Sequence, residues 1–338
     1  MAAASALRRL LICLATLIGV IPAASAATIT VYTAYEDDEA AAFLALAKVD
    51  MPDLEVRLLR LSTGDLTARI LAEASSPRHD VIWGQAVSNL EDPRLRATLE
   101  PYEPDSLARL PAQFRGAGGA WFAPTGYLVA FCVNHDRLKA KGLPMPTSWA
   151  DLAKPVYRGE LILPDPRSSG TGFVQVASIL QVGGEQAGWE MLRALDRNTV
   201  RYVASGSQPC YEASSGTVAI GASFDHRAVK IIADHLPITM VIPSEGAGNE
   251  LEGNALVATS QNKEAARRFL DWTLSENAIR AYVGWKAIVA PQAGYRPLKF
   301  RLAGMPENAA EVMLRMDFAK VARDRPQILS RWEKEFGR

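Results

Sequence analysis

Short strand-like segments alternate with helical patterns along most of the chain, and this alternation limits the folds that the sequence can adopt. Residues 27–32 form a β-branched run, and a helical pattern follows over residues 38–48. Residues 54–61 again resemble a strand, and residues 65–74 a helix. Such alternation predicts an α/β fold with a parallel sheet. In these sheets ligands bind beyond the carboxyl ends of the strands, so we expect functional residues in the segments that follow each strand.

Two further apolar strands divide the chain into two lobes. The first, residues 127–133, lies between a glycine-rich loop and a proline-rich link and predicts a crossover into a second lobe. The other, residues 254–259, predicts the return. We therefore expect an α/β clamshell with two hinge crossovers, in which residues 27–127 and 257–338 form the first lobe and residues 128–256 form the second. Lobes joined in this way close around a ligand.

The first 26 residues have the pattern of a secretory signal. Arg8 and Arg9 supply a positive region, an apolar run follows, and Ala24-Ser25-Ala26 has the small residues that a signal peptidase needs. The run is too short for a membrane-spanning helix. We expect cleavage after Ala26 and a periplasmic location.

Charge argues against a nucleic-acid partner. The chain has 37 Lys and Arg residues and 37 Asp and Glu residues, so loss of Arg8 and Arg9 leaves 35 against 37, a net charge of −2. A nucleic-acid surface would be strongly basic.

Two cysteines, Cys132 and Cys210, remain after the expected cleavage. An even pair in an exported protein predicts one disulfide, and the alternative is two buried free thiols.

Two turns rich in hydroxyl groups and glycine follow predicted strands and begin predicted helices. A helix N-terminus presents free N–H groups and a partial positive charge, and glycine and hydroxyl groups there favour a phosphate-like or carboxylate group. Ordinary N-capping also explains either turn alone, but one turn in each lobe favours an anion clamp. The turns are Ser62-Thr63-Gly64 and Ser168-Ser169-Gly170-Thr171-Gly172.

Acidic and aromatic side chains near strand ends are suited to bind a cation rather than an anion. Glu36 follows the first strand, and Asp225 follows a strand that ends near Ala222. Either carboxylate could hold an ammonium group by charge-assisted hydrogen bonds, or could be a solvated charge. Three aromatic residues could wall the cavity or stack on a cation, or could pack in the core. They are Tyr35, Trp83 and Tyr127.

Weaker candidates lie in two loops. Arg227 could bind an anion or form a structural salt bridge. Ser205 and Ser207 could contact a ligand, or Cys210 could fix their loop structurally. His226 is expected to make a hydrogen bond at the rim of the cleft. The histidines show no metal-binding spacing and the chain has no nucleophile motif, so we expect no metal, no cofactor and no catalysis.

Over residues 28–332 the sequence resembles the extracellular solute-binding proteins of the type II periplasmic class. Within that class it is most similar to the 2-aminoethylphosphonate-binding subfamily of ABC importers, a sister of the ferric-iron-binding proteins. Pro146-Thr147-Ser148-Trp149 is typical only of the superfamily. Two segments are more specific to the subfamily, Ser168-Ser169-Gly170-Thr171-Gly172-Phe173 and Ser205-Gly206-Ser207-Gln208-Pro209-Cys210.

The resemblance implies a monomer that captures 2-aminoethylphosphonate, a zwitterion, and delivers it to an ABC permease in the inner membrane. The two helix starts suit the phosphonate, and Glu36 or Asp225 suits the ammonium group. The alternatives are a ferric–anion complex, a polyamine, another phosphonate or a phosphate ester. A sensor subunit that docks on a receptor is a further alternative.

The chain departs from its relatives at two places. Asp225-His226 stands where the subfamily usually has an acidic residue followed by tyrosine. The iron binders have a tyrosine pair in that loop, and a glutamate where this chain has Gln85. Loss of both tyrosines and of that carboxylate argues against direct ferric binding, while His226 leaves a shifted ligand preference open.

Overall fold

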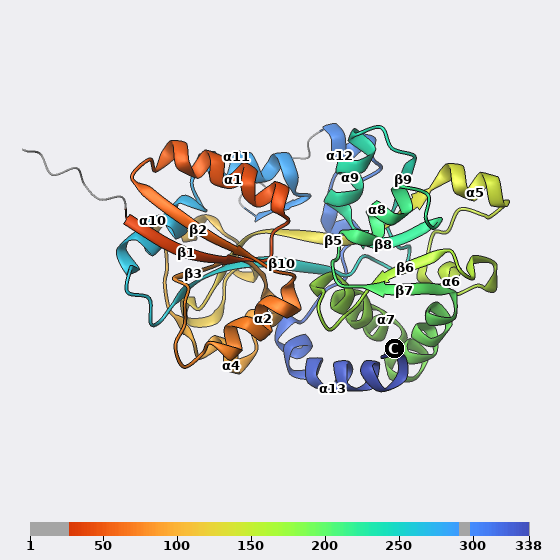
Figure 1. The fold of residues 1–338 in the computed structure, drawn as a ribbon, viewed down its shortest axis with the longest axis horizontal. Coiled ribbons are helices and arrows are strands. Elements are labelled where there is room, and N and C mark those ends of the chain that lie inside the picture. The colour runs from red at the N-terminus through yellow and green to blue at the C-terminus, as the bar shows by residue number, and fades with distance from the viewer. Residues whose placement is uncertain (1–26, 291–297, 338) are drawn as a thin grey trace, which may run out of the picture.

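The computed structural model describes residues 27–290 and 298–337. They form two lobes joined by strands β5 (Phe122–Asn134) and β10 (Asn249–Val257) (Figure 1). The expected signal, residues 1–26, lies outside the described residues. None of the helices in the described part combines the length and the apolar composition that a membrane crossing requires.

The first lobe is a sheet covered on both faces. Its strand order is β2-β1-β3-β10-β5, and β1 pairs in parallel with β2 and β3, as the alternating pattern predicts. Helices α1, α10 and α11 pack on one face, and α2 and α3 on the other. The bounds are β1 (Ala27–Thr33), β2 (Leu54–Arg60), β3 (Val81–Ala86), β4 (Leu99–Glu100), β11 (Ile288–Val289), α1 (Asp37–Asp50), α2 (Thr63–Ala72), α3 (Val87–Leu90), α4 (Pro93–Arg96), α10 (Lys263–Trp272) and α11 (Glu276–Trp285).

The second lobe has the same layered construction. Strand β6 pairs in parallel with β7 and β8, and β5 pairs antiparallel with β8 and β9. Helices α6, α7 and α13 share one apolar cluster, and α8 and α9 pack in another. The bounds are β6 (Leu161–Pro164), β7 (Thr199–Val203), β8 (Ile220–Phe224), β9 (Ile238–Val241), α5 (His135–Lys141), α6 (Trp149–Leu152), α7 (Gly170–Asn198), α8 (Gln208–Ser214), α9 (Asp225–Ala233), α12 (Leu298–Leu302) and α13 (Phe318–Phe336).

The two crossover strands pair with each other in antiparallel register. Gly126 on β5 lies opposite Leu251 on β10, and Tyr127 lies opposite Glu250. Because one strand leaves the first lobe and the other returns to it, this part of the sheet is antiparallel rather than parallel. Every residue of both strands is buried, so the hinge is also part of the core.

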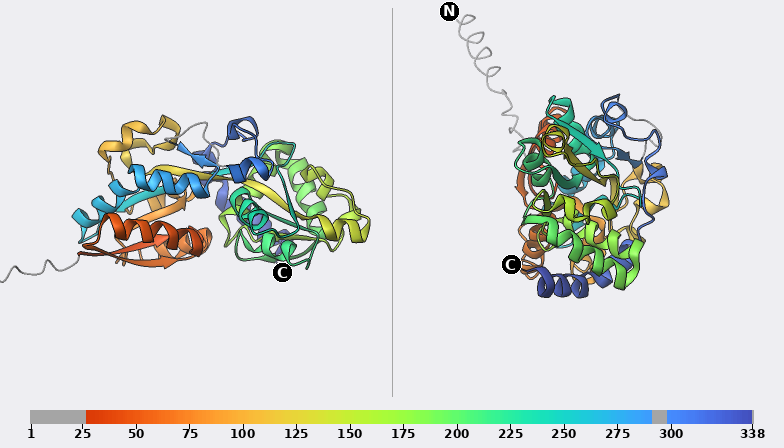
Figure 2. Two further views of the ribbon diagram at one scale, coloured as in Figure 1. Left: turned by 90° about the horizontal axis from the view of Figure 1, so that it is seen from above. Right: turned by 90° about the vertical axis from the view of Figure 1, so that its right-hand side faces the viewer.

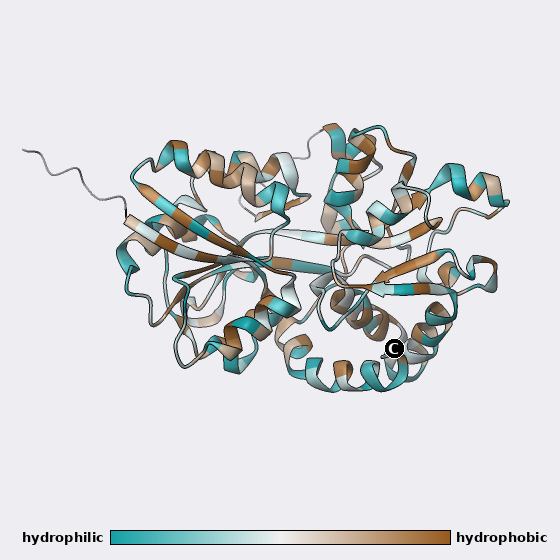
Figure 3. Cartoon of the chain, in the orientation of Figure 1, coloured by the Kyte–Doolittle hydropathy of each residue, from teal (hydrophilic) through white to brown (hydrophobic). Residues whose placement is uncertain are grey.

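The C-terminal helix packs on both lobes. Residues 257–338 were expected in the first lobe, and α13 contacts α3 there, but it also lies along α7 of the second lobe (Figures 1 and 2). Its buried Trp332 and Phe336 share a cluster with Trp189, and Arg193 pairs with Glu335 at 2.8 Å. Hydrophilic and hydrophobic residues alternate along α13 (Figure 3). An amphipathic pattern predicts a buried face but not the lobe that covers it.

The predicted disulfide between Cys132 and Cys210 is confirmed. It joins β5 to α8 with a Cα–Cα distance of 5.1 Å, and both cysteines are fully buried. The bond therefore ties the start of α8, just after residues 205–207, to the central strand of the second lobe.

Candidate ligand-binding cleft

A cavity lies between the two lobes and holds about 390 Å³ of empty space, part of it open to solvent. Residues from both lobes line it, and many of them are polar or charged. They are Ala34, Glu36, Glu39, Arg60, Ser62, Thr63, Tyr127, Ser169, Gly170, Thr171, Gly206, Phe224, His226 and Glu252.

The N-terminus of α2 meets the N-terminus of α7 at one end of this cavity. The backbone N–H of Gly64 donates to the carbonyl oxygen of Ser168 over 2.7 Å. A Cβ atom on Gly170 would lie 2.7 Å from Oγ1 of Thr63, so both turns need glycine for this approach. Two positive helix ends therefore converge on one small space.

Ordinary N-capping explains the turn before α7 better than the turn before α2. Ser169 is the N-cap of α7 and accepts a hydrogen bond from the backbone N–H of Gly172 at 3.2 Å. Ser62, the N-cap of α2, makes no such bond. The α2 turn is instead stabilised by a side chain of β3. Gln85 Nε2 donates to the carbonyl oxygen of Thr63 at 3.3 Å and to Oγ1 of Thr67 at 3.0 Å.

The loop of residues 205–207 lies against the tip of α7. A Cβ atom on Gly206 would overlap the hydroxyl group of Thr171. Ser223 donates to the carbonyl oxygen of Gly206 at 2.7 Å, and Ser205 Oγ lies 2.8 Å from Ser207 Oγ. The loop therefore forms a wall of the cavity through its backbone more than through its side chains.

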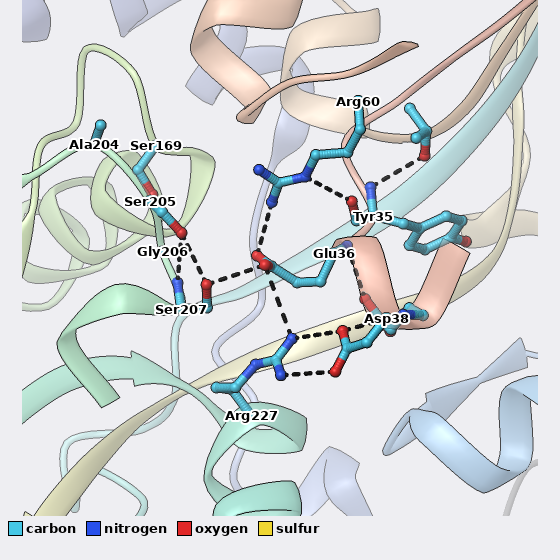
Figure 4. Close-up of polar contacts among 12 residues, drawn as sticks. Tyr35, Glu36, Asp38, Arg60, Ser169, Ala204, Ser205, Gly206, Ser207 and Arg227 are labelled. Carbon is cyan, nitrogen blue, oxygen red and sulfur yellow. Dashed lines mark hydrogen bonds and ion pairs between the residues drawn. The ribbon is translucent and has the colours of Figure 1, made fainter. Parts of the chain in front are cut away.

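Glu36 belongs to an ionic network that joins the lobes (Figure 4). Its Oε1 pairs with Arg60 at 3.1 Å, and its Oε2 accepts a hydrogen bond from Ser207 at 3.0 Å. Arg227, on α9 of the second lobe, binds both oxygens of Asp38 on α1 at 3.0 Å each, and lies 3.8 Å from Glu36. Arg227 is thus an inter-lobe salt-bridge residue rather than a free anion ligand.

A second charged cluster is fully buried at the base of the cavity. The Nζ atom of Lys286 lies 2.6 Å from Glu39 Oε1 and 2.6 Å from Glu252 Oε1. His226 Nε2 lies 3.5 Å from Glu39 Oε1, and its Nδ1 lies 3.2 Å from Asp225. Glu39 lies on α1, Glu252 on β10 and His226 on α9, so this cluster also spans both lobes and the hinge.

The pKa values of this cluster follow its charges. Burial and the nearby Glu39 raise the pKa of Glu252. Burial opposes ionisation of Glu39, but Lys286 and His226 hold its pKa well below the usual range. Burial and Lys286 oppose protonation of His226, yet Glu39 and Asp225 raise its pKa above the ordinary value. The cluster therefore favours a positive charge at His226.

The structure brings some of the predicted ligand residues to the cavity and places the others behind it. Tyr35 and Trp83 pack edge to face in the core of the first lobe, because α1 and α10 cover the face on which they lie. Ser168 bonds to the backbone of Ala204. The predicted residues that line the cavity are Glu36, Ser62, Thr63, Tyr127, Ser169, Gly170, Thr171 and His226, and those that do not are Tyr35, Gly64, Trp83, Ser168, Gly172, Ser205, Ser207, Asp225 and Arg227.

Sequence reasoning missed Glu39, Glu252 and Arg60 as lining residues and Lys286 behind them. A signal for Glu252 was present, because an acidic residue in an otherwise buried strand needs a partner. Within residues 27–290 and 298–337, no group of His, Cys, Asp and Glu side chains has the geometry to hold a metal ion.

The sequence of residues 95–293, more than half of the chain, matches the family of bacterial extracellular solute-binding proteins. The chain belongs to this family. Membership implies a small-molecule ligand, a periplasmic location and an ABC permease as partner, and the members are transport proteins rather than enzymes.

Known relatives agree with this assignment. A probable ABC transporter periplasmic-binding protein of Sinorhizobium fredii is 27% identical over 77% of this chain and 73% of its own length. The phosphoglycerate transport regulatory protein PgtC of Salmonella typhimurium is 26% identical over 67% of this chain and 56% of its own length.

A solved structure confirms the two-lobed clamshell fold. The periplasmic binding protein AfuA of Actinobacillus pleuropneumoniae, with exogenous fructose-6-phosphate bound, superposes with a TM-score of 0.83 at 25% identity. The similarity covers 92% of this chain and 98% of AfuA.

Proposed function

We propose that this protein captures 2-aminoethylphosphonate for import. The observation that carries the proposal is the meeting of two helix N-termini at one end of the cavity, whose lining includes Ser62, Thr63, Ser169 and Thr171. Helix N-termini bind phosphate-like groups through free N–H donors and a partial positive charge. The phosphonate group would occupy this end.

The rest of the lining suits a ligand that also carries a positive charge. Glu36, Glu39 and Glu252 face the cavity, against Arg60 and His226. A dianion alone would meet repulsion from these carboxylates, whereas an ammonium group would be attracted to them. A small zwitterion with separated charges satisfies both ends of the cavity.

A phosphate ester is the second candidate ligand, and two relatives favour it. AfuA has fructose-6-phosphate bound, and PgtC is named for the transport of phosphoglycerate. The helix tips would bind a phosphate group as well as a phosphonate. The carboxylates Glu39 and Glu252 distinguish the two ligands, because neither phosphate ester carries an ammonium group.

Isothermal titration calorimetry with 2-aminoethylphosphonate, fructose 6-phosphate, spermidine and ferric citrate tests the proposal. Saturable heat at one site per chain is expected from 2-aminoethylphosphonate, with much weaker heat from the others. Heat from ferric citrate or the sugar phosphate, with none from 2-aminoethylphosphonate, would contradict it. Matched titrations at low and high salt identify charge-driven binding.

A further inference from the structure

The carboxylate that the sequence singled out first is already compensated by two arginines. Glu36 uses Oε1 for Arg60 at 3.1 Å and Oε2 for Ser207 at 3.0 Å, with Arg227 a further 3.8 Å away. Asp225 is fully buried behind the wall and binds the backbone N–H and the ring of its neighbour His226. We therefore expect a positively charged group in the cavity to bind to other acidic side chains.

Glu39 and Glu252 are the other acids in the wall. Both line the cavity although both are buried, and both already share the ammonium group of Lys286. Glu252 Oε2 also accepts a hydrogen bond from Thr125 at 2.7 Å. Their geometry is therefore fixed before any ligand arrives.

The charges of this cluster do not cancel. Three buried carboxylates, Glu39, Glu252 and Asp225, face one permanent cation, Lys286. Oδ2 of Asp225 has no hydrogen-bond partner. Three carboxylates against one ammonium group leave a net charge of −2, and buried charges are stable only when they are compensated, so the cluster favours further positive charge.

Two sources can supply that charge. The ring of His226 lies at the edge of the cluster, with Nε2 3.5 Å from Glu39 and 3.3 Å from Lys286. It faces Glu39 from α1, Lys286 after α11, Glu252 from β10 and Tyr127 from β5. The second source is a cationic group of a ligand in the adjoining cavity.

We propose that Glu39 and Glu252, with His226 beside them, form the subsite for the ammonium group of the ligand, and that this ammonium group replaces the proton of His226. The proposal rests on the proposed function and extends it, because it names the acids that select an amine and predicts that binding releases a proton. The raised pKa values of His226 and Glu252 agree with a cluster whose net charge is negative.

The first test compares 2-aminoethylphosphonate with ethylphosphonate, which lacks only the amine. In the wild type the dissociation constant of ethylphosphonate is expected to be at least 100-fold higher, roughly the effect of losing one charge-assisted contact in a buried site. In Glu252→Gln this ratio is expected to fall at least 10-fold. In Glu250→Gln it is expected to persist, because that buried acid on the same strand does not line the cavity.

The second test counts protons and does not depend on a change at Glu252. Calorimetry near pH 7 in buffers of different ionisation enthalpy is expected to show more proton release with 2-aminoethylphosphonate than with ethylphosphonate. The difference is expected to vanish in His226→Gln. Equal proton release from both ligands in the wild type would overturn the replacement of the His226 proton.

The outcomes distinguish an error in the proposed subsite from an error in the proposed function. If 2-aminoethylphosphonate binds but Glu36→Gln abolishes the preference for the amine and Glu252→Gln retains it, the subsite is wrong and the proposed function stands. If neither phosphonate binds, the proposed function is wrong and the subsite fails with it.

Discussion

The backbone N–H of Gly64 donates a hydrogen bond of 2.7 Å to the carbonyl oxygen of Ser168. The bond joins the first turn of α2 in the first lobe to the residue before the N-cap of α7 in the second. It closes the cleft at the end where the two helix N-termini converge. Closure of the cleft therefore depends on the two turns at which we propose that the phosphonate group binds.

The close approach at Gly64 predicts a closure defect. A Cβ atom there would overlap the carbonyl oxygen of Arg167, so Gly64→Ala should hold the lobes apart. We expect at least a 10-fold loss of affinity for 2-aminoethylphosphonate with little change in thermal stability. Gly284→Ala is the control, because Gly284 is an exposed helix residue with open space around its Cβ position. Equal affinity in both variants would rule out this steric role.

The salt bridge between Arg227 and Asp38 predicts a slow release of ligand. Asp38→Asn removes a bidentate ion pair between the lobes, which is worth about 1–2 kcal/mol. Stopped-flow measurements should show dissociation roughly 10-fold faster, with a similar association rate. Asp37→Asn, an exposed neighbour on α1, should behave as the wild type. A change confined to the association rate would argue that this salt bridge does not hold the lobes closed around the ligand.

The buried carboxyl of Glu250 predicts a pH-dependent stability. Burial raises its pKa from 4.5 to about 7, although hydrogen bonds from Ser88 and from the backbone of Leu251 oppose the shift. The folded chain thus keeps a proton that the unfolded chain loses near pH 4.5. The stabilisation is complete below pH 4.5 and is lost as the pH rises through about 7.

Glu250→Gln removes this dependence, since an amide does not titrate. Relative to the variant, the wild type should lose roughly 3 kcal/mol of unfolding free energy between pH 4.5 and pH 8. Urea denaturation of both proteins across this range measures the difference. Parallel curves at every pH would show that Glu250 titrates normally.

The disulfide predicts a coupling between redox state and binding. Replacing both Cys132 and Cys210 by alanine should cost about 2–4 kcal/mol of stability. Because the bond anchors the start of α8 beside residues 205–207, affinity for the ligand should fall as well. Thermal unfolding and titration of the double variant check both effects. If stability falls without any loss of affinity, the disulfide does not contribute to the shape of the cleft.

The parts of the fold that depend on local pattern could be predicted from the sequence. Hydroxyl- and glycine-rich turns after strands indicated the two helix tips, and Thr63 and Thr171 do lie on one cavity. The even pair of exported cysteines indicated the disulfide. The two turns are encoded within a few neighbouring residues, and the disulfide follows because two cysteines allow only one pairing.

The features that depend on distant contacts could not be predicted in this way. Glu39, Glu252 and Lys286 come together from α1, β10 and the segment after α11, and no local pattern marks them as partners. The pairing of Arg227 with Asp38 exists only when the lobes meet. Trp83 follows the rule for strand-end residues, but its side chain points to the helix-covered face.

In the proposed binding mode the phosphonate group is held between the tips of α2 and α7. Calorimetric titration of Ser169→Ala combined with Thr171→Ala tests it most directly, with Ser148→Ala as a control that removes an N-cap on α6 outside the cavity. We expect the double variant to bind 2-aminoethylphosphonate about 2–4 kcal/mol more weakly, from about 1–2 kcal/mol per charge-assisted bond, while the control binds normally. Unchanged affinity in the double variant would show that the phosphonate group is not held by these residues.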